Sequence, residues 1–521
     1  MNLHLDKKSI LKKTVQVGAA TLLSRVVAIA REVLQVKFFG VGALSDAFIV
    51  AFRLPNLFRH VFAEGALSAS FVPVFVKTVK QGQRDDANGL MSALFFLIQS
   101  FIFALYAVIL LKGDWVVACI APGFSAEQAV YTELFLKILF PFLAFVSASA
   151  LLGGALNAVN NFFIPAVGPA LWNITYVATL MVCVVWQLPP TYLCIGVLLG
   201  GAVQFLLNIV AYFNQKFSFG PVTQASKLLF KEVMTKFLPC LLGVSIIEIN
   251  LFVSGVVASY LPQGSVSLLY YGSRFMNIPL GVFGVALSGI LLPHFSRVVL
   301  YAPKRFNFYL LEVAKFVTWV ILPISLLFMF ISEELFAMIF LLAKKISPEH
   351  VVQAKWILVI YCAGLVFFCF NKVLLSLFYS LKDTRSTTIA SGIGAMINMG
   401  GDLISLYYGS VYGIAASAVA AGLGMSLVSC YFLHKQHSFR IYWESYLIFL
   451  GRFAGQLACG VSLFLGLYYG VGYCSAGTAL MPLLTSILGY WLLVGACGGV
   501  TAVWFYLTRK IFRVNAYFLK G

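Results

Sequence analysis

The sequence has 521 residues, of which 61% are hydrophobic and only 10% are charged. Soluble proteins carry about 25% charged residues, so this composition excludes an ordinary soluble enzyme and indicates a polytopic membrane protein. The formal net charge of +18 would suggest nucleic-acid binding in a soluble protein. Here the basic residues fall mostly in short segments between apolar runs, as expected for cytoplasmic loops, so we expect no nucleic-acid partner.

Fourteen apolar runs are long enough to cross a membrane, since a span needs about 20 apolar residues. They cover residues 14–39, 44–76, 89–112, 128–156, 163–187, 191–214, 228–260, 266–296, 308–332, 350–379, 386–408, 411–434, 446–471 and 480–508. The first run is too long for a cleavable signal and lacks a small-residue cleavage site, so we interpret it as the first span. The predicted fold is an all-α polytopic membrane protein with about 14 transmembrane helices.

The distribution of basic residues predicts the orientation of these spans. Lys7, Lys8, Lys12 and Lys13 precede the first span, and most even-numbered loops are basic. The odd-numbered loops are nearly free of basic residues, apart from Lys112 and the Lys344–Lys345 pair. Because excess Lys and Arg mark the cytoplasmic side, we expect both termini to be cytoplasmic.

Charged residues also lie inside three of the predicted spans. The first contributes two arginines, the second contributes two arginines and two acids, and the eighth contributes one arginine. These residues are Arg25, Arg31, Asp46, Arg53, Arg59, Glu64 and Arg274. An arginine at the bilayer centre costs about 2.5–3.5 kcal/mol on insertion scales, so we expect these residues to have a structural or functional role.

Two interpretations of these charges remain. In the first, Asp46 and Glu64 each pair with an arginine and hold the helices together, which leaves three arginines unmatched. In the second, the arginines line a water-filled cavity and bind an anion. The planar guanidinium fork matches phosphate oxygens, so we favour a multiply charged cargo such as a phosphate or diphosphate.

A repeat relates the second span to the eighth. Asp46 precedes Arg53 by the same seven residues that separate Ser267 from Arg274. The two segments are six spans apart, so they share one orientation, which is typical of transporters with parallel repeats. We therefore predict two six-helix lobes, residues 1–222 and 223–440, with two extra helices in residues 441–521.

A second polar cluster is predicted from Glu248 and Asn250 in the seventh span and Asn398 and Asp402 in the eleventh. Asn398 and Asp402 are four residues apart and therefore share a helix face. Carboxylate and amide oxygens suit a hard cation such as Na⁺, and Asp402 could instead take a proton. Hydrogen bonding between helices explains the same residues equally well.

Catalytic and cofactor motifs are missing from the sequence. The six histidines have no metal-ligand spacing, and no phosphate-binding loop of the ATPase type occurs. The ten cysteines form no Cys-x-x-Cys pair, which does not favour a zinc site or a disulfide framework. We therefore expect a protein that is not an enzyme and requires no cofactor.

Several segments resemble the MurJ (MviN) family of lipid II flippases, which belongs to the MOP transporter superfamily. They are SRVVAIARE, GALSDAFIVAFRLPNLFRHVFAEGALSASFVPVF, APGF, IPAVGPALWNI, GSVSLLYYGSRFMNIPLGVFGVALSGILLP and FYSLKDTRS. The resemblance extends from about Ser24 to Arg385 and is most specific in spans one, two and eight.

The resemblance implies a monomer in the bacterial cytoplasmic membrane that moves lipid II, a diphosphate-linked precursor of peptidoglycan, between leaflets by alternating access. It implies that spans 13 and 14 form a groove for the lipid tail, and that cell-wall synthesis proteins are potential partners. Arg25, Arg31, Arg59 and Arg274 occupy the family's cavity-arginine positions, and Asp46 occupies that of its span-two acid. The acid that some members carry after the span-eight arginine is Asn277 here. Some relatives bind sodium with residues in spans seven and eleven, and Asn398 and Asp402 match that pattern.

Three other functions are weighed against this one. A multidrug antiporter of the same superfamily would need an acidic pocket for cationic drugs. A membrane enzyme acting on polyprenyl diphosphate would need a metal-binding acid cluster or a catalytic histidine. A scaffold for cell-wall synthases would use its buried charges only for assembly. Measuring headgroup accessibility across vesicles would separate all four functions.

Overall fold

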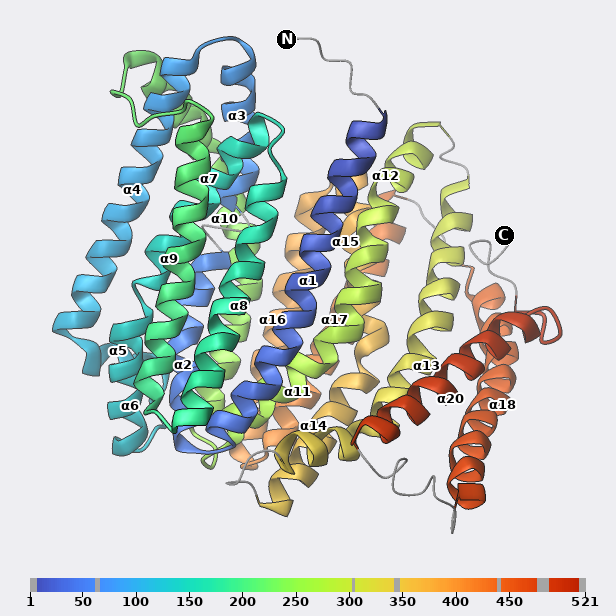
Figure 1. The fold of residues 1–521 in the computed structure, drawn as a ribbon. Coiled ribbons are helices and arrows are strands. Elements are labelled where there is room, and N and C mark those ends of the chain that lie inside the picture. The colour runs from blue at the N-terminus through green and yellow to red at the C-terminus, as the bar shows by residue number, and fades with distance from the viewer. Residues whose placement is uncertain are drawn as a thin grey trace. The chain divides into compact units, whose positions relative to one another are not determined.

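The computed structural model describes residues 7–60, 66–301, 305–341, 347–437, 442–475 and 487–514. Throughout these ranges the secondary structure is helical and contains no strand (Figure 1). The all-α prediction is therefore confirmed. Glu64 lies outside the described residues, so its assignment stays a prediction.

The first half of the chain forms nine helices in the described ranges, and four of them, α1, α4, α8 and α9, have 24 residues or more. They are α1 (Lys7–Phe39), α2 (Ala43–Arg59), α3 (Ala66–Lys80), α4 (Arg84–Leu111), α5 (Gly113–Ile120), α6 (Ala126–Leu139), α7 (Phe142–Ala158), α8 (Phe163–Trp186) and α9 (Pro190–Asn214). Helix α2 contains Pro55 and continues to Arg59, so this proline does not end it. Helix α6 begins with a capping box in which Ser125 and Gln128 satisfy each other's backbone N–H groups.

The second half begins with the long helix α10 and ends with a helix pair. The elements are α10 (Gln224–Ser259), α11 (Ser265–Pro279), the π-helix η2 (Leu280–Val285), α12 (Ala286–Tyr301), α13 (Phe306–Leu341), α14 (Pro348–Ala363), α15 (Leu365–Ser380), α16 (Thr384–Tyr407), α17 (Val411–His437), α18 (Trp443–Ser475) and α20 (Ile487–Thr508). Helices α14 and α15 meet at a bend of 42° and together match the predicted span 350–379.

Ten helical segments in the described residues are long and apolar enough to cross a membrane, and the bent pair α14–α15 gives an eleventh. All eleven coincide with predicted spans. The other three predicted spans are 14–39, 44–76 and 228–260. Each includes residues that the structure does not describe in full, so the count of about 14 is consistent with the structure and stays a prediction.

The chain divides into two packing units. The first comprises residues 1–271, 339–350 and 402–411, and the second comprises residues 272–338, 351–401 and 412–521. This division reflects packing in one conformation. The predicted lobes 1–222 and 223–440 and the C-terminal region 441–521 therefore remain predictions.

Close helix packing in the first unit depends on glycine. Helix α8 packs between α1 and α9, as Figure 1 shows. A Cβ atom at Gly196 of α9 would lie 2.3 Å from the side chain of Thr179 on α8, and one at Gly200 would lie 2.8 Å from Trp172. Small residues let membrane helices approach closely, which adds van der Waals contact where the hydrophobic effect contributes little. The α8–α9 pair thus forms a rigid support for α1.

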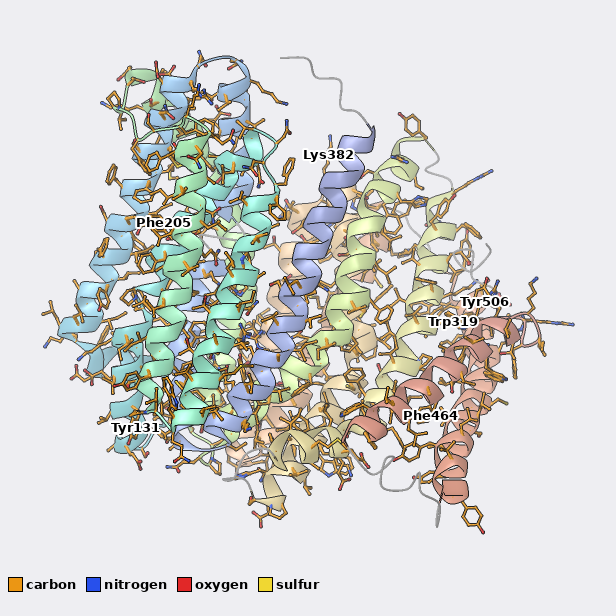
Figure 2. The ribbon with its side chains drawn as sticks, viewed as in Figure 1. Tyr131, Phe205, Trp319, Lys382, Phe464 and Tyr506 are labelled. Carbon is orange, nitrogen blue, oxygen red and sulfur yellow. The ribbon has the colours of Figure 1, made fainter. Side chains whose placement is uncertain are left out.

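In the second unit, hydrogen bonds connect α13 to the C-terminal helices α18 and α20. The indole N–H of Trp319 donates to Gln456 at 3.2 Å, and the Gln456 amide donates to the Phe505 carbonyl at 2.8 Å and to Thr508 at 3.0 Å. Gln456 is fully buried. Figure 2 shows Trp319 on the side of α13 that faces these two helices. A buried polar group therefore links all three helices.

Candidate functional site

Arg31 is surrounded by side chains of its own helix α1 and of α8. Its Nη2 lies 2.5 Å from the Glu32 carboxylate, and its Nη1 donates to Asn173 on α8 at 2.9 Å. The guanidinium carbon also lies 5.0 Å from the ring centre of Trp172 and 5.3 Å from that of Tyr176. Aromatic faces attract cations, so the rings and the carboxylate together stabilise a buried charge.

Glu32 is a charged residue of the first span that the sequence interpretation missed. It follows Arg31 directly in the sequence, and it was not counted among the charges of the first span. The structure nevertheless places the two side chains in an ion pair, and Tyr270 of α11 donates to Glu32 at 3.5 Å. The first span therefore carries its own acid, which was left out of the predicted balance of five arginines and two acids.

Arg25 lies on the same helix in a different environment. Its side chain is exposed, as are those of neighbouring Val26 and Ile29. Within the part of the chain that the structure describes, Arg25 forms no hydrogen bond or ion pair. The structure thus separates two residues that the sequence treats alike, one fixed within the helix packing and one exposed.

Asp46, at the start of α2, is only 1% exposed and is surrounded by donors. Its Oδ1 accepts from the backbone N–H and the hydroxyl of Ser267, both at 2.8 Å. Its Oδ2 accepts from the Gly264 N–H at 2.7 Å and from the Gln128 amide at 3.4 Å. The carboxylate therefore caps the N-terminus of α11, where backbone N–H groups favour a negative charge.

The contact between Asp46 and Ser267 joins the two copies of the repeat. The two residues occupy equivalent positions in the sequence pattern, each seven residues before an arginine. A second bond lies beside them, since the Ser45 hydroxyl and the Tyr271 hydroxyl are 3.0 Å apart. The N-terminal parts of α2 and α11 are thereby joined by buried hydrogen bonds.

The remaining arginines of α2 are half-buried. The Nε of Arg59 donates to Asn56 one turn earlier at 3.1 Å. The guanidinium of Arg53 lies next to Gly255 of α10. Arg274 is also half-buried on α11, and it belongs to the second unit.

The predicted cation-binding residues lie on α10 and α16. Glu248 and Asn250 are half-buried, whereas Asn398 and Asp402 are 3% and 0% exposed. Asp402 accepts a hydrogen bond from Ser254 of α10 at 2.6 Å. Asn398 accepts one from Ser417 of α17 at 3.2 Å. Neither serine was predicted, although Ser254 lies one turn after Asn250 on the same helix.

These contacts support interhelical hydrogen bonding and leave the cation hypothesis open. The described residues include no cluster of three His, Cys, Asp or Glu side chains that could hold a metal ion. Serine hydroxyls, amide oxygens and a carboxylate are nevertheless the oxygen ligands that hard cations take. A cation or proton at Asp402 therefore remains a proposal.

Comparisons with known proteins identify the family. The model of the family described as "Lipid II flippase MurJ" matches residues 35–479. The probable lipid II flippase MurJ of Vibrio cholerae is 33% identical over 439 residues, covering 81% of this chain and 82% of that protein. The lipid II flippase MurJ of Burkholderia cenocepacia is 31% identical over 423 residues, covering 79% and 81%.

Solved structures share the fold. A lipid II flippase MurJ in an inward closed conformation aligns with a TM-score of 0.78 at 23% identity, covering 96% of this chain and 99% of that one. An inward-facing multidrug resistance MATE transporter of the MOP superfamily aligns with a TM-score of 0.69 at 13% identity, covering 80% and 94%. At these identities the structures show the fold alone, whereas the family match and the relatives above 30% identity establish that this chain, a multi-pass membrane protein, belongs to the lipid II flippase MurJ family.

Proposed function

We propose that this protein translocates lipid II from the inner to the outer leaflet of the bacterial cytoplasmic membrane, for cell-wall synthesis. The family match over residues 35–479 carries the proposal. The charge of the candidate site supports it, because its basic residues suit a diphosphate and not the cationic cargo of a multidrug antiporter. Transport of this kind needs no catalytic group, in keeping with an activity that is not enzymatic.

Within this proposal, the arginines divide into two roles. Arg25, Arg53, Arg59 and Arg274 provide guanidinium forks for the diphosphate, since such forks form paired hydrogen bonds with phosphate oxygens. Arg31 stays with Glu32 and its aromatic neighbours and holds α1 against α8. Glu64 is retained in the site as a prediction.

Transport by alternating access would require one side of the protein to be closed while the other is open. The buried bonds of Asp46 support this idea, because they fasten α2 to the start of α11 and to Gln128 of α6. Separation of these helix ends would break all of them together. In this scheme, lobes 1–222 and 223–440 move against each other, and residues 441–521 hold the lipid tail.

The driving force is either the membrane potential or a coupled Na⁺ or proton. Glu248, Asn250, Asn398 and Asp402 are the proposed ligands of the cation, and Asp402 would instead take the proton. We further propose that the protein acts as a monomer with both termini in the cytoplasm, near cell-wall synthesis proteins.

The test is headgroup transport in reconstituted vesicles. Purified protein is inserted into vesicles whose inner leaflet contains labelled lipid II, and a membrane-impermeant reagent reports the headgroups that reach the outer leaflet. We expect protein-dependent exposure of the label, with no exposure in empty vesicles. Exposure at the rate of empty vesicles would contradict the proposed function.

A further inference from the structure

The turn that connects α10 to α11 is fixed at its second end by Asp46. The backbone N–H groups of Gly264 and Ser267 donate to the Asp46 carboxylate at 2.7 and 2.8 Å. Gly264 also lies against the segment before α2, because a Cβ atom at this position would be 2.7 Å from the side chain of Val41. The end of the turn that leads into α11 is therefore held at the start of α2.

The first end of the same turn contacts the loop between α5 and α6. The backbone N–H of Gly123 in this loop donates to the hydroxyl oxygen of Ser259 at 3.2 Å. The Ser259 hydroxyl in turn donates to the Val256 carbonyl at 2.7 Å, and Ser259 is only 2% exposed. The turn is thus held at both of its ends by segments of the predicted first lobe, residues 1–222.

Gly123 allows the backbones of the loop and of α10 to approach closely. A Cβ atom at position 123 would lie 2.5 Å from the Cα and 2.6 Å from the N of Tyr260, and 2.6 Å from the carbonyl oxygen of Ser259. Real Cβ atoms essentially never come within 3.0 Å of another heavy atom, and backbone atoms cannot turn away as the end of a side chain can. Gly123 does not have a positive φ, so the contact itself requires glycine here.

Gln128 connects the contact at Gly123 with the contact at Asp46. Its side-chain oxygen accepts from the backbone N–H of Ser125, two residues after Gly123, at 3.1 Å. Its amide donates to the Asp46 carboxylate at 3.4 Å, and the side chain is buried. Since both contacts share this glutamine, we expect the release of one to weaken the other.

We propose that the α10–α11 turn closes one side of the transport path and that it is held closed at two points, by Asp46 and by Gly123. The proposal rests on the proposed function, because Gly123 and Ser259 belong to the two predicted lobes that alternating access would separate. In the closed state the turn lies against both points, and in the open state it leaves both. Gly123 contributes by its lack of a side chain and binds no substrate.

Cross-linking the turn to the loop tests whether they must separate. Pro122→Cys and Tyr260→Cys place thiols at two exposed positions next to the contact, and a cleavable bis-maleimide joins them in vesicles that contain lipid II. We expect transport to fall by more than about tenfold and to recover when a reductant cleaves the linker. Each single variant, treated with the same reagent, should keep its untreated rate. An unchanged rate in the cross-linked double variant would overturn the proposal.

The substitution Gly123→Ala tests the role of the glycine. The new methyl group overlaps backbone atoms of Tyr260, so the loop and the turn should move apart. The reporter is Ser259→Cys, whose reaction with a water-soluble maleimide is followed by mass spectrometry of the peptide that carries position 259. We expect G123A to make this reaction about tenfold faster, which corresponds to about 1.4 kcal/mol between the closed and open states. Equal rates with and without G123A would overturn the proposal.

A matched control is Gly392→Ala in α16, in the same reporter background. The chemical change is the same, but a Cβ atom at Gly392 would meet nothing within 4 Å. We expect the reaction at position 259 to stay within about twofold of the reporter alone, since the change affects only helix propensity. An equal acceleration by G392A and G123A would overturn the proposal.

Thermal unfolding of each purified variant shows whether it folds. If G123A does not fold, the cross-link decides the proposal, because it leaves Gly123 in place. The transport rate of the wild-type protein in the same vesicles reports on the proposed function itself, and its absence would contradict that function. The reaction at position 259 needs no lipid II, so it still measures the opening of the turn in that case.

Discussion

Arg25 and Arg31, two arginines on α1, lie in very different environments. Arg31 is enclosed by Glu32, Asn173 and two aromatic rings. Arg25 is exposed and forms no hydrogen bond or ion pair with the described residues. Insertion of an arginine costs about 2.5–3.5 kcal/mol at the bilayer centre, and only Arg31 has internal partners that offset this cost.

The comparison motivates a distinction between charges that stabilise the helix packing and charges that we propose to bind the cargo. A buried charge whose hydrogen bonds are all internal stabilises one arrangement of helices. An exposed charge within a membrane helix contributes little to packing, so we connect it with the substrate. The following predictions test this distinction in order of decreasing expected effect.

Arg31→Ala should destabilise the protein most. The substitution leaves the Glu32 carboxylate buried without its ion-pair partner, which costs about 3–5 kcal/mol. Arg25→Ala is the matched control, with the same change on the same helix and no partner lost in the described structure. Thermal unfolding of both purified variants measures the difference, and equal losses of stability would contradict the distinction.

Asp46→Asn should have the next largest effect. The change removes the negative charge and turns an amide N–H₂ group toward donors that need an acceptor, such as the N–H groups of Gly264 and Ser267. The expected loss is about 2–3 kcal/mol of unfolding free energy. Asp114→Asn, the same change at an exposed aspartate of α5, should be nearly neutral. A wild-type unfolding temperature for D46N would show that the cap is not needed for stability.

Gln456→Leu tests whether a buried polar side chain without charge also contributes to stability. Leucine removes the acceptor of the Trp319 N–H and the donor to the Phe505 carbonyl, while keeping a similar volume. We expect a loss of about 1–2 kcal/mol, less than at either charged site. The readout is chemical unfolding followed by Trp fluorescence. A loss larger than that of R31A would reverse the predicted order.

The smallest effect is expected outside the spans, at Asp383 between α15 and α16. Burial alone would raise the pKa of Asp383, but hydrogen bonds from the Ser386 N–H at 3.0 Å and from His437 at 2.9 Å lower it below its ordinary value. A lowered pKa means that the carboxylate contributes stability at neutral pH. That contribution disappears as the pH falls through the lowered pKa of the folded protein.

The variant Asp383→Asn tests this dependence. The wild-type protein should lose stability between neutral and acidic pH by more than D383N does, as measured by unfolding temperature across a pH series. Parallel curves for the two proteins would show that Asp383 does not contribute.

Much of the fold could be predicted from the sequence because membrane insertion imposes simple rules. The length of the apolar runs predicted eleven spans that coincide with apolar helical segments of the structure. The matching spacings of Asp46–Arg53 and Ser267–Arg274 predicted a relation between two segments, and the structure places Asp46 and Ser267 of these segments in contact. The environment of each charge was not predictable in the same way. Hydropathy reports how apolar a segment is, and it does not report which face of a helix packs against its neighbour.

The residues that were missed illustrate this limit. Glu32 was not counted among the predicted charges, and the surroundings of its partner Arg31 are formed by Asn173, Trp172 and Tyr176 of α8. Ser254 was also missed, because its hydrogen bond to Asp402 depends on the packing of α10 against α16. Such features depend on three-dimensional packing, which no local pattern encodes.

The most direct test of the central claim is the transport rate of Arg25→Ala, measured per folded protein in vesicles that contain lipid II. We predict an unfolding temperature equal to that of wild type and a transport rate about 100-fold lower, because one phosphate-binding fork is lost from the site. Wild-type transport by folded R25A would contradict the account.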